Sequence, residues 1–506
     1  MRTSSSLLCL GLLLLAPSTL RADDKAVIVH EWGTFTSLQD ENGQAIGGIN
    51  VDDEPVPGFV FQDGSQPVEA QYSNDKGNFG LPPYGTPTTK GWAVGDPAVT
   101  MRLETPVLYL YPPKGQTPQS VPPLNVHVDF HGGFLTQFYP YAHAVPFNGI
   151  GEITGKSTSS LDWAGVKMGS TEKPVETDDK VWTTPREVGA PLLQVMMHFE
   201  GGDEKPDPVG VLQAEHFLFY RGVGHLDSPI YLNRNPSNVD KKDWLYVWPN
   251  WVDRVSHAST PQGDIALDAL YPEGWLTEIH ADGSCAFRLV SPFQEGSRTR
   301  IHSLTDFSSK FAAIDFTVAN LTTLKASMQA ALVKEGLYPD EASAMLRTWE
   351  LSYFKSPGLR FFYIVPRAWV DRVLPLKISG APTDITRVMI GRIELINDEQ
   401  KAALARLAAG PCPDLASVKQ AAFNALEKGH LTDAQKEPFY SGEKPLSELG
   451  IAIPPLVQDY LSLGRFRDAL IVHEQQQHAS PALAQFIKDN SLAQAKEYTA
   501  DPTASR

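Results

Sequence analysis

Residues 359–365, which read LRFFYIV, and residues 387–396, which read RVMIGRIELI, are dominated by apolar, aromatic and β-branched side chains. Runs of this kind are typical of strands that are covered on both faces. Both runs belong to the stretch 320–396, in which two helical patterns come before the first run. We therefore predict the order helix, helix, strand, loop, strand for this stretch, which joins two regions of different composition.

The two helical patterns have recognisable ends. The first places Leu324 and Leu332 on one face, and Gly336 stands where a left-handed residue would end the helix. The second begins at residues 338–341, where a proline and two acidic residues suit a first helical turn. Its apolar stripe continues to Tyr353, so we predict one uninterrupted helix up to that point.

After residue 396 the composition shifts to Ala, Leu, Lys, Glu and Gln, with prolines in the loops between helical patterns. The predicted helices span residues 398–409, 414–428, 454–463, 465–478 and 481–496. Residues 398–506 are therefore predicted to form a mainly helical region.

Residues 25–317 have the opposite character, with short strand-like runs and frequent Gly and Pro. The predicted strands span residues 26–38, 102–111, 124–130, 134–139 and 215–220, with a hairpin at 275–290 and an irregular excursion at 50–100. Strands at this spacing favour a sandwich or a distorted barrel. The predicted fold is α+β, with a β-rich domain at 23–318, an α/β joint at 319–397 and the helical region at 398–506.

The first 22 residues have the pattern of a secretory signal peptide. Arg2 gives a positive start, residues 7–16 form a short apolar core, and Leu20-Arg21-Ala22 is a candidate cleavage site. Loss of this segment removes two arginines, so the formal net charge falls from -16 to -18. We predict an exported, soluble protein, periplasmic or secreted.

An acidic chain of this kind is poorly suited to bind nucleic acid or an anionic membrane, because both partners are polyanions. No later apolar run approaches the roughly 20 residues that a membrane helix needs. We therefore predict neither a nucleic-acid partner nor a membrane span.

Two cysteines, Cys285 and Cys412, remain after the signal peptide. They could form one disulfide in an oxidising compartment, but a fold of this size needs no such crosslink, and two buried thiols are favoured. Cys285 is also a candidate nucleophile with His280 or His302 as its base, although a buried cysteine is the simpler interpretation.

Several segments together resemble a family of exported bacterial proteins of uncharacterised function. They are HEWGTFT at residues 30–36, ETPVLY at 104–109, FLFYRGVG at 217–224, and the segments at 335–349 and 387–394. The resemblance covers most of the mature chain and implies export. It implies no activity, cofactor or catalytic residue.

The strongest candidate for chemistry is the row His127, Asp129 and His131 on the strand predicted at 124–130. Alternate residues of a strand share one face and lie about 7 Å apart along it. Imidazole and carboxylate groups in such a row could hold Zn²⁺ or another divalent cation. The alternative is the solvated face of an antiparallel strand, which is polar without a further role.

Two other patterns are weaker candidates for metal sites. His473 and His478 are five residues apart, which separates them by about 140° around a regular helix and favours an exposed helix end over a zinc site. The acidic loops at 52–54 and 74–78 could bind Ca²⁺ but do not match the twelve-residue calcium loop.

Aromatic side chains suggest a carbohydrate ligand. His30 and Trp32 share one face of the first predicted strand and Glu31 the other, an arrangement that could line a sugar site or anchor the strand. Tryptophans that we expect to be exposed occur at five further positions, which are Trp92, Trp163, Trp244, Trp248 and Trp251. Near the end of the fold-deciding stretch, Arg392 and Glu394 are predicted to form an ion pair at a domain contact.

These patterns favour a binding or interaction protein of the cell envelope or exterior, with a glycan as one candidate ligand and another protein as the other. The first alternative is a metal-dependent hydrolase centred on His127, Asp129 and His131. The second is a scaffold that docks a partner through its helical region. The sequence leaves open whether the protein is an enzyme.

Overall fold

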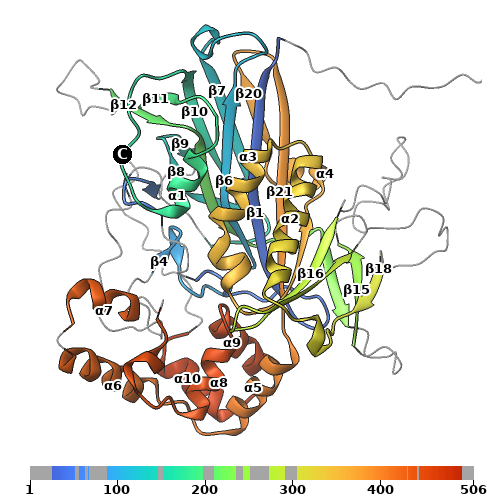
Figure 1. Ribbon diagram of the computed structural model, residues 1–506, viewed down its shortest axis with the longest axis vertical. Coiled ribbons are helices and arrows are strands. Elements are labelled where there is room, and N and C mark those ends of the chain that lie inside the picture. Colours follow the sequence, from blue (N-terminus) through green and yellow to red (C-terminus); the bar gives the residue numbers. More distant parts are fainter. Residues whose placement is uncertain are drawn as a thin grey trace, which may run out of the picture.

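The computed structural model describes residues 25–51, 56–62, 66–67, 88–145, 152–197, 210–234, 243–250, 273–290, 305–429, 431–440 and 444–492. Strands predominate in the first half of the chain and helices in the second. The predicted α+β class, with a β-rich N-terminal part and a helical C-terminal part, is therefore confirmed. Figure 1 shows a tall β structure with a group of helices at one end.

The largest element is a ten-stranded sheet with the strand order β17, β16, β19, β21, β1, β6, β13, β8, β2, β3. In that order the strands are Cys285–Val290, Gly274–Ile279, Gly358–Ile364, Thr383–Leu395, Val27–Gln39, Met101–Tyr111, Leu218–Gly224, Gly133–Tyr139, Phe61–Gln62 and Gln66–Pro67. Distant parts of the chain thus share one sheet.

The centre of this sheet is the parallel pair β1 and β21. Their register runs from Val27 opposite Thr383 to Gln39 opposite Leu395. On its other side, β1 pairs antiparallel with β6. The stretch predicted as a joint at 319–397 therefore contributes β19 and β21 to the interior of the sheet.

The strand predicted at 215–220 is placed differently by the structure. Residues 211–215 form β12 (Val211–Glu215) in another sheet, and β13 begins at Leu218 and continues through two glycines. A side chain at Gly222 would lie 2.1 Å from the carbonyl oxygen of Phe134, so only glycine permits the close pairing of β13 with β8.

One face of the ten-stranded sheet is covered by α2 (Ala319–Lys334) and α3 (Pro339–Thr348), which Figure 1 shows lying across the strands. The Nδ1 atom of His30 on β1 is 2.7 Å from Oε2 of Glu341. The hydroxyl of Tyr111 donates to Oε1 of Glu341 at 2.6 Å, and the backbone N–H of Tyr338 donates to Oε2 at 2.7 Å. One buried carboxylate therefore caps α3 and fixes it to the sheet.

The helix predicted to reach Tyr353 is interrupted. α3 ends at Thr348, and Glu350–Lys355 forms a π-helix. Nη1 of Arg360 on β19 donates to the carbonyl oxygens of Ser352 and Tyr353 at 2.9 and 3.0 Å. The wider helical turn leaves carbonyl groups without a partner of their own, and the arginine satisfies them.

The opposite face packs against a six-stranded sheet and α4 (Arg367–Val373). This second sheet has the order β12, β11, β10, β7, β20, with β9 paired to β10. Its further strands are β11 (Leu193–Met197), β10 (Thr158–Met168), β7 (Leu124–His131), β20 (Leu376–Ser379) and β9 (His143–Val145). α1 (Lys180–Arg186) contacts α3, so segments about 150 residues apart in the chain pack together.

Two smaller sheets complete the β structure. The first has the order β14 (Ile230–Arg234), β15 (Trp244–Pro249), β18 (Thr305–Ser308), and the second pairs β4 (Thr88–Thr89) with β5 (Trp92–Ala93). The short strands β2 to β5 lie in the excursion predicted at 50–100, whose residues 52–55, 63–65 and 68–87 are outside the described part.

The helical region contains α5 (Asp398–Ala409), α6 (Leu415–Lys428), α7 (Asp433–Tyr440), α8 (Pro455–Ser462), α9 (Arg467–Gln477) and α10 (Pro481–Asp489). α5 has the predicted bounds. α10 ends at Asp489, before the predicted residue 496, and is followed by Asn490 and by Ser491, which has a φ of 51°. The short helices α1, α4 and α7 were not predicted, because each has too few residues to show a periodic apolar stripe.

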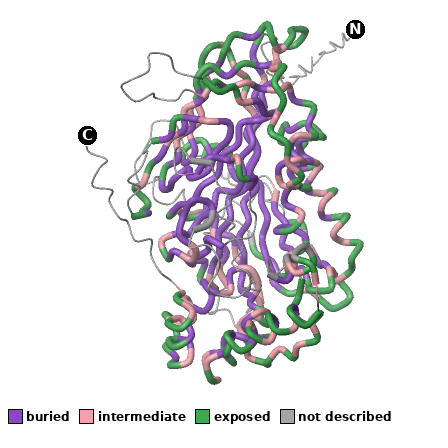
Figure 2. The backbone as a smooth tube through the Cα atoms, turned by 90° about the vertical axis from the view of Figure 1, so that its left-hand side faces the viewer, coloured by how far each residue is buried: buried purple, intermediate pink, exposed green. Residues whose placement is uncertain are grey.

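The helical region and the sheet share a core. Leu38, Phe134 and Val223 from three strands of the sheet pack in one buried cluster with helical residues such as Leu404 and Ile471. Figure 2 shows the buried residues concentrated along the strands and the exposed ones at the rim. Among the residues that the structure describes, no helix is long and apolar enough to cross a membrane.

A buried ion pair ties the parallel strands together. Nε of Arg387 on β21 donates to Oε2 of Glu31 on β1, and both side chains are almost completely buried. The hydroxyl of Tyr220 on β13 donates to the same carboxylate, and Nη1 of Arg387 reaches Asp371 on α4 at 2.9 Å. Burial alone would lower the pKa of Arg387, but the charge of Glu31 outweighs it and raises this pKa.

Removing one partner of this pair should strongly destabilise the protein. We expect Glu31→Leu and Arg387→Met each to lower the free energy of unfolding by about 3–5 kcal/mol, because each leaves an uncompensated buried charge. The double variant should lose less than the sum of the two. Urea denaturation followed by circular dichroism measures all three values.

The matched control is the exposed ion pair between Arg347 and Glu187, whose atoms lie 2.6 Å apart. Arg347→Met should change the stability by less than about 1 kcal/mol. Additive losses in the Glu31 and Arg387 variants would show that the two side chains do not stabilise the fold as a pair.

Candidate functional site

The row predicted as a metal site lies on β7, and its alternation is as expected. Val126, Val128 and Phe130 are buried, whereas His127, Asp129 and His131 face outward. This face is the outer face of the six-stranded sheet. The strand therefore has the polar outward side that both interpretations of the row require.

The structure brings His127 and Asp129 together but sends His131 elsewhere. Nδ1 of His127 is 2.7 Å from Asp162 on the neighbouring strand β10, and Nε2 is 3.0 Å from Asp129. Nδ1 of His131 instead lies 2.9 Å from the carbonyl oxygen of Arg372. A carboxylate oxygen lies at each ring nitrogen of His127, which favours the doubly protonated imidazole. In that form neither nitrogen presents a lone pair to a metal.

In the described part of the chain, no group of three or more His, Cys, Asp or Glu side chains is placed to hold a metal ion. The three-ligand site predicted at His127, Asp129 and His131 is therefore not formed in this structure. His127, Asp129 and Asp162 form a charged cluster instead, which links β7 to β10. The residues 52–54 and 74–78, predicted as candidate calcium loops, lie outside the described part.

The other histidine and cysteine candidates are explained by packing. His473 lies within α9 and His478 just beyond its end, where Nδ1 of His478 is 3.0 Å from Glu474. Cys285 and Cys412 are both free thiols, as favoured over a disulfide, but only Cys285 is buried and Cys412 is partly exposed. His280 contacts Ser284 and stacks on Phe316, and His302 lies outside the described part.

The segment His30, Glu31 and Trp32 anchors β1 and does not line a sugar site. All three side chains are buried. His30 binds the carboxylate of α3 and Glu31 binds Arg387, on opposite faces of the strand. The anchoring alternative considered for this segment therefore describes it.

Two of the tryptophans expected to be exposed are buried. Trp92 donates from Nε1 to Asp96 at 2.7 Å, and Trp163 donates to the carbonyl oxygen of Pro140 at 2.9 Å. The polar atom of each indole thus has a partner inside the protein, which permits complete burial. Trp251 lies outside the described part.

The remaining two tryptophans share one face of the three-stranded sheet. Apolar side chains of β14, β15 and β18, which are Ile230, Leu232, Leu245, Val247 and Phe307, point inward and are buried, whereas the intervening residues are half-buried or exposed. We call the outward set the aromatic face; it comprises Tyr231, Trp244, Tyr246 and Trp248, with the polar residues Asn233, Asp306 and Ser308 among them.

The strand register brings these side chains together. Tyr231 lies opposite Trp248, and their nearly parallel rings have centroids 6.3 Å apart. Tyr246 lies opposite Asn233 on one side and Asp306 on the other. Aromatic rings therefore adjoin amide and carboxylate groups on a single surface, a combination that suits a ligand with both C–H and hydroxyl groups.

Sequence reasoning identified Trp244 and Trp248 but missed Tyr231 and Tyr246. The signal was present in the segment WLYVW at residues 244–248, which alternates aromatic and aliphatic side chains. A period of two predicts a strand with an aromatic face and an aliphatic face. The partner strand β14 repeats the alternation over residues 230–233.

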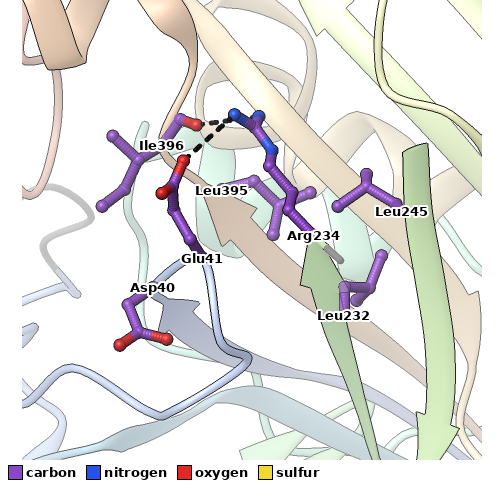
Figure 3. Close-up of a pocket in the computed structure, with 7 residues that line it drawn as sticks. All are labelled: Asp40, Glu41, Leu232, Arg234, Leu245, Leu395 and Ile396. Atoms are coloured by element: carbon purple, nitrogen blue, oxygen red, sulfur yellow. Dashed lines mark hydrogen bonds and ion pairs between the residues drawn. The ribbon is translucent and has the colours of Figure 1, made fainter. Parts of the chain in front are cut away.

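A small hollow lies beside this sheet, at the ends of β1 and β21 (Figure 3). It has a volume of about 10 Å³, room for a single water molecule, and is lined by Asp40, Glu41, Leu232, Arg234, Leu245, Leu395 and Ile396. Figure 3 shows Arg234 pointing toward Glu41 and the carbonyl group of Ile396, to which Nη2 donates at 3.1 Å. The hollow belongs to an ion-pair network between strands and is too small for a substrate.

Comparisons with known proteins add no relative. No protein-family model, no curated protein and no solved structure matches this chain.

The charged cluster of His127 should make stability depend on pH. Burial lowers the pKa of His127, but Asp162 and Asp129 outweigh this and raise the pKa above its usual 6.5. The imidazolium contribution is therefore fully present below pH 6.5 and is lost as the pH rises through the higher pKa of the folded protein. We expect His127→Gln to cost up to about 1 kcal/mol at pH 5.5 and less at pH 9.

Urea midpoints of the wild type and the variant at both pH values test this expectation. His131→Gln is the control, because His131 contacts a carbonyl group and not a carboxylate. An equal loss at pH 5.5 and pH 9 for His127→Gln would contradict the charged form of the imidazole.

The two thiols should differ in reactivity. Burial raises the pKa of Cys285 to about 11, so little thiolate exists at pH 8. Iodoacetamide should modify the partly exposed Cys412 first and Cys285 only after unfolding. Mass spectrometry of the native and denatured protein, with Cys412→Ser as the control, measures this. Fast labelling of Cys285 in the native protein would contradict its burial.

Proposed function

We propose that the protein is exported and binds glycans, and that the aromatic face of the three-stranded sheet is the binding surface. The observation that carries the proposal is the grouping of Tyr231, Trp244, Tyr246 and Trp248 on one side of three short strands. Export is supported by the signal-peptide pattern of residues 1–22.

The chemistry of the surface matches a sugar ring. The C–H groups on one side of a pyranose pack against the face of an indole or phenol, and its hydroxyl groups need donors and acceptors at the rim. Asn233 offers both a donor and an acceptor. The side-chain amide of Asn233 donates to the carbonyl oxygen of Asn42 at 3.3 Å, which holds its orientation.

The position of the surface also suits binding. β14 is hydrogen-bonded to the turn after β1, since the backbone N–H of Arg234 donates to the carbonyl oxygen of Glu41 at 2.8 Å. Its inward side rests on buried residues such as Leu232, Leu245 and Phe307. The aromatic side chains therefore stand on a rigid support, which lowers the entropy lost when a ligand binds.

Binding to soluble oligosaccharides should depend on Trp248. In a panel of plant, algal and bacterial glycans, we expect at least one ligand whose affinity falls about tenfold, or 1.4 kcal/mol, in Trp248→Ala. Tyr231→Ala should act in the same direction because its ring stacks with Trp248. Intrinsic fluorescence and isothermal titration calorimetry measure the affinities.

Phe423→Ala is the control, since Phe423 is an exposed aromatic side chain on α6, outside the aromatic face. Its affinity should equal that of the wild type, and thermal unfolding should confirm that all variants fold. The proposal is wrong if no glycan binds, or if a bound glycan is held equally well by Trp248→Ala.

A further inference from the structure

A group of charged side chains is buried where the ten-stranded sheet meets the helical region. We call it the arginine cluster; it consists of Arg102, Glu104, Arg360, Arg392, Glu394 and Arg465. The predicted ion pair between Arg392 and Glu394 is present, with Nε of Arg392 3.3 Å from Oε1 of Glu394.

The register of the central strands explains how the cluster forms. Thr36 on β1 lies opposite Arg392 on β21 and opposite Arg102 on β6. Residues that are opposite each other in adjacent strands project from the same face. Arg465, in the loop between α8 and α9, reaches the same face from the helical region, and its Nη2 lies 3.1 Å from Oε1 of Glu104.

The carboxylate of Glu104 is already engaged by other donors. Its Oε1 lies 2.8 Å from Nη2 of Arg102, in addition to Arg465, and its Oε2 accepts from the hydroxyl of Thr36 at 2.8 Å. Nη2 of Arg392 is 3.7 Å from Oε2, beyond hydrogen-bond distance.

Arg392 is therefore unusual among the buried arginines. Its side chain is completely buried, and in the described part of the chain Nε, Nη1 and Nη2 make no hydrogen bond. The contact of Nε with Glu394 at 3.3 Å is an ion pair without hydrogen-bond geometry. Arg387, equally buried on the same strand, donates to Glu31 and Asp371. The guanidinium of Arg392 also lies over the ring of Tyr353, with Cζ 5.3 Å from its centroid, which leaves the donors in the guanidinium plane directed elsewhere.

Buried donors almost always have an acceptor, and a charged donor is the most costly to leave without one. Burial lowers the pKa of Arg360, Glu394 acts against this shift, and the positive charge of Arg465 adds to it. The arginine cluster contains four guanidinium groups and two carboxylates, so an acceptor beside Arg392 lies in a net positive environment, which favours an anion over neutral water. The planar guanidinium fork suits an oxyanion, and the complete burial of the side chain favours a small one.

We propose that Arg392 binds a small inorganic anion, either chloride or a tetrahedral oxyanion, within the arginine cluster. The anion neutralises the guanidinium and connects β21 to the loop that carries Arg465. It acts as a structural ligand that holds the helical region on the sheet, and it is independent of glycan binding.

The test uses the purified mature protein in a gluconate buffer, because gluconate is too large for the buried position. Chloride, sulfate or phosphate replaces gluconate at constant ionic strength, and the melting temperature is measured. The wild type should gain several degrees in a saturable manner with at least one of these anions, because a ligand that binds only the folded state stabilises it. The anion that acts at the lowest concentration identifies the ligand.

Ion chromatography provides a second readout that needs no variant. After dialysis and acid denaturation, the wild-type protein should release about one anion per chain. Arg392→Met should release none and should show no dependence of its melting temperature on the anion. If Arg392→Met does not fold, Arg392→Lys keeps the charge without the fork and should need at least tenfold more anion for the same gain.

Arg186→Met is the matched control. Arg186 is a partly buried arginine whose Nε and Nη2 bind Glu215 at 3.0 and 2.6 Å. Its loss should lower the melting temperature while the anion-dependent gain persists. A wild-type protein that releases no anion and melts at the same temperature in all salts would overturn the proposal, as would an unchanged gain in an Arg392 variant.

Discussion

Glu31 and Arg387 are hydrogen-bonded in the fold although 356 residues separate them in the chain. They lie on the parallel strands β1 and β21, and the ordered chain between them must be arranged around this pairing. β6, β13 and β8 extend the sheet on the side of β1, whereas β19, β16 and β17 extend it on the side of β21. The closure of so long a loop costs entropy before any contact forms, so the buried contacts across the pair have to offset it.

Local patterns predicted most elements but not how they meet. The alternation of β7, the start of α3 and the bounds of α5 follow from neighbouring residues, and each was predicted. The pairing of β1 with β21 was not predicted, because the sequence of a strand does not identify the strand with which it pairs. The burial of Trp92 and Trp163 was missed for the same reason, since each depends on an acceptor supplied by the fold. For the aromatic face, two of four aromatic residues were identified.

The His127 cluster, the Glu31–Arg387 pair and the arginine cluster differ in how their charges are paired. His127 stands between two carboxylates at the surface, and Glu31 with Arg387 forms a complete buried network. The arginine cluster is also buried, but all three guanidinium nitrogens of Arg392 make no hydrogen bond in the described part of the fold. The sequence predicted a metal site at the His127 cluster, because His and Asp are common metal ligands in recognisable motifs. Buried hydrogen-bond donors that lack an acceptor can be recognised only in the folded structure, because the sequence does not show which groups lie next to each other.

Because the sheet and the helices share one core, we expect the two parts of the protein to unfold together. Leu38, Phe134 and Val223 reach across the boundary and are covered by the helical region. A shortened chain that stopped after β21 would expose these side chains to water as an apolar patch that promotes aggregation. The helices alone would lack the apolar surface of the sheet against which they pack. The helical region thus covers part of the sheet's core, and we expect neither part to be stable without the other.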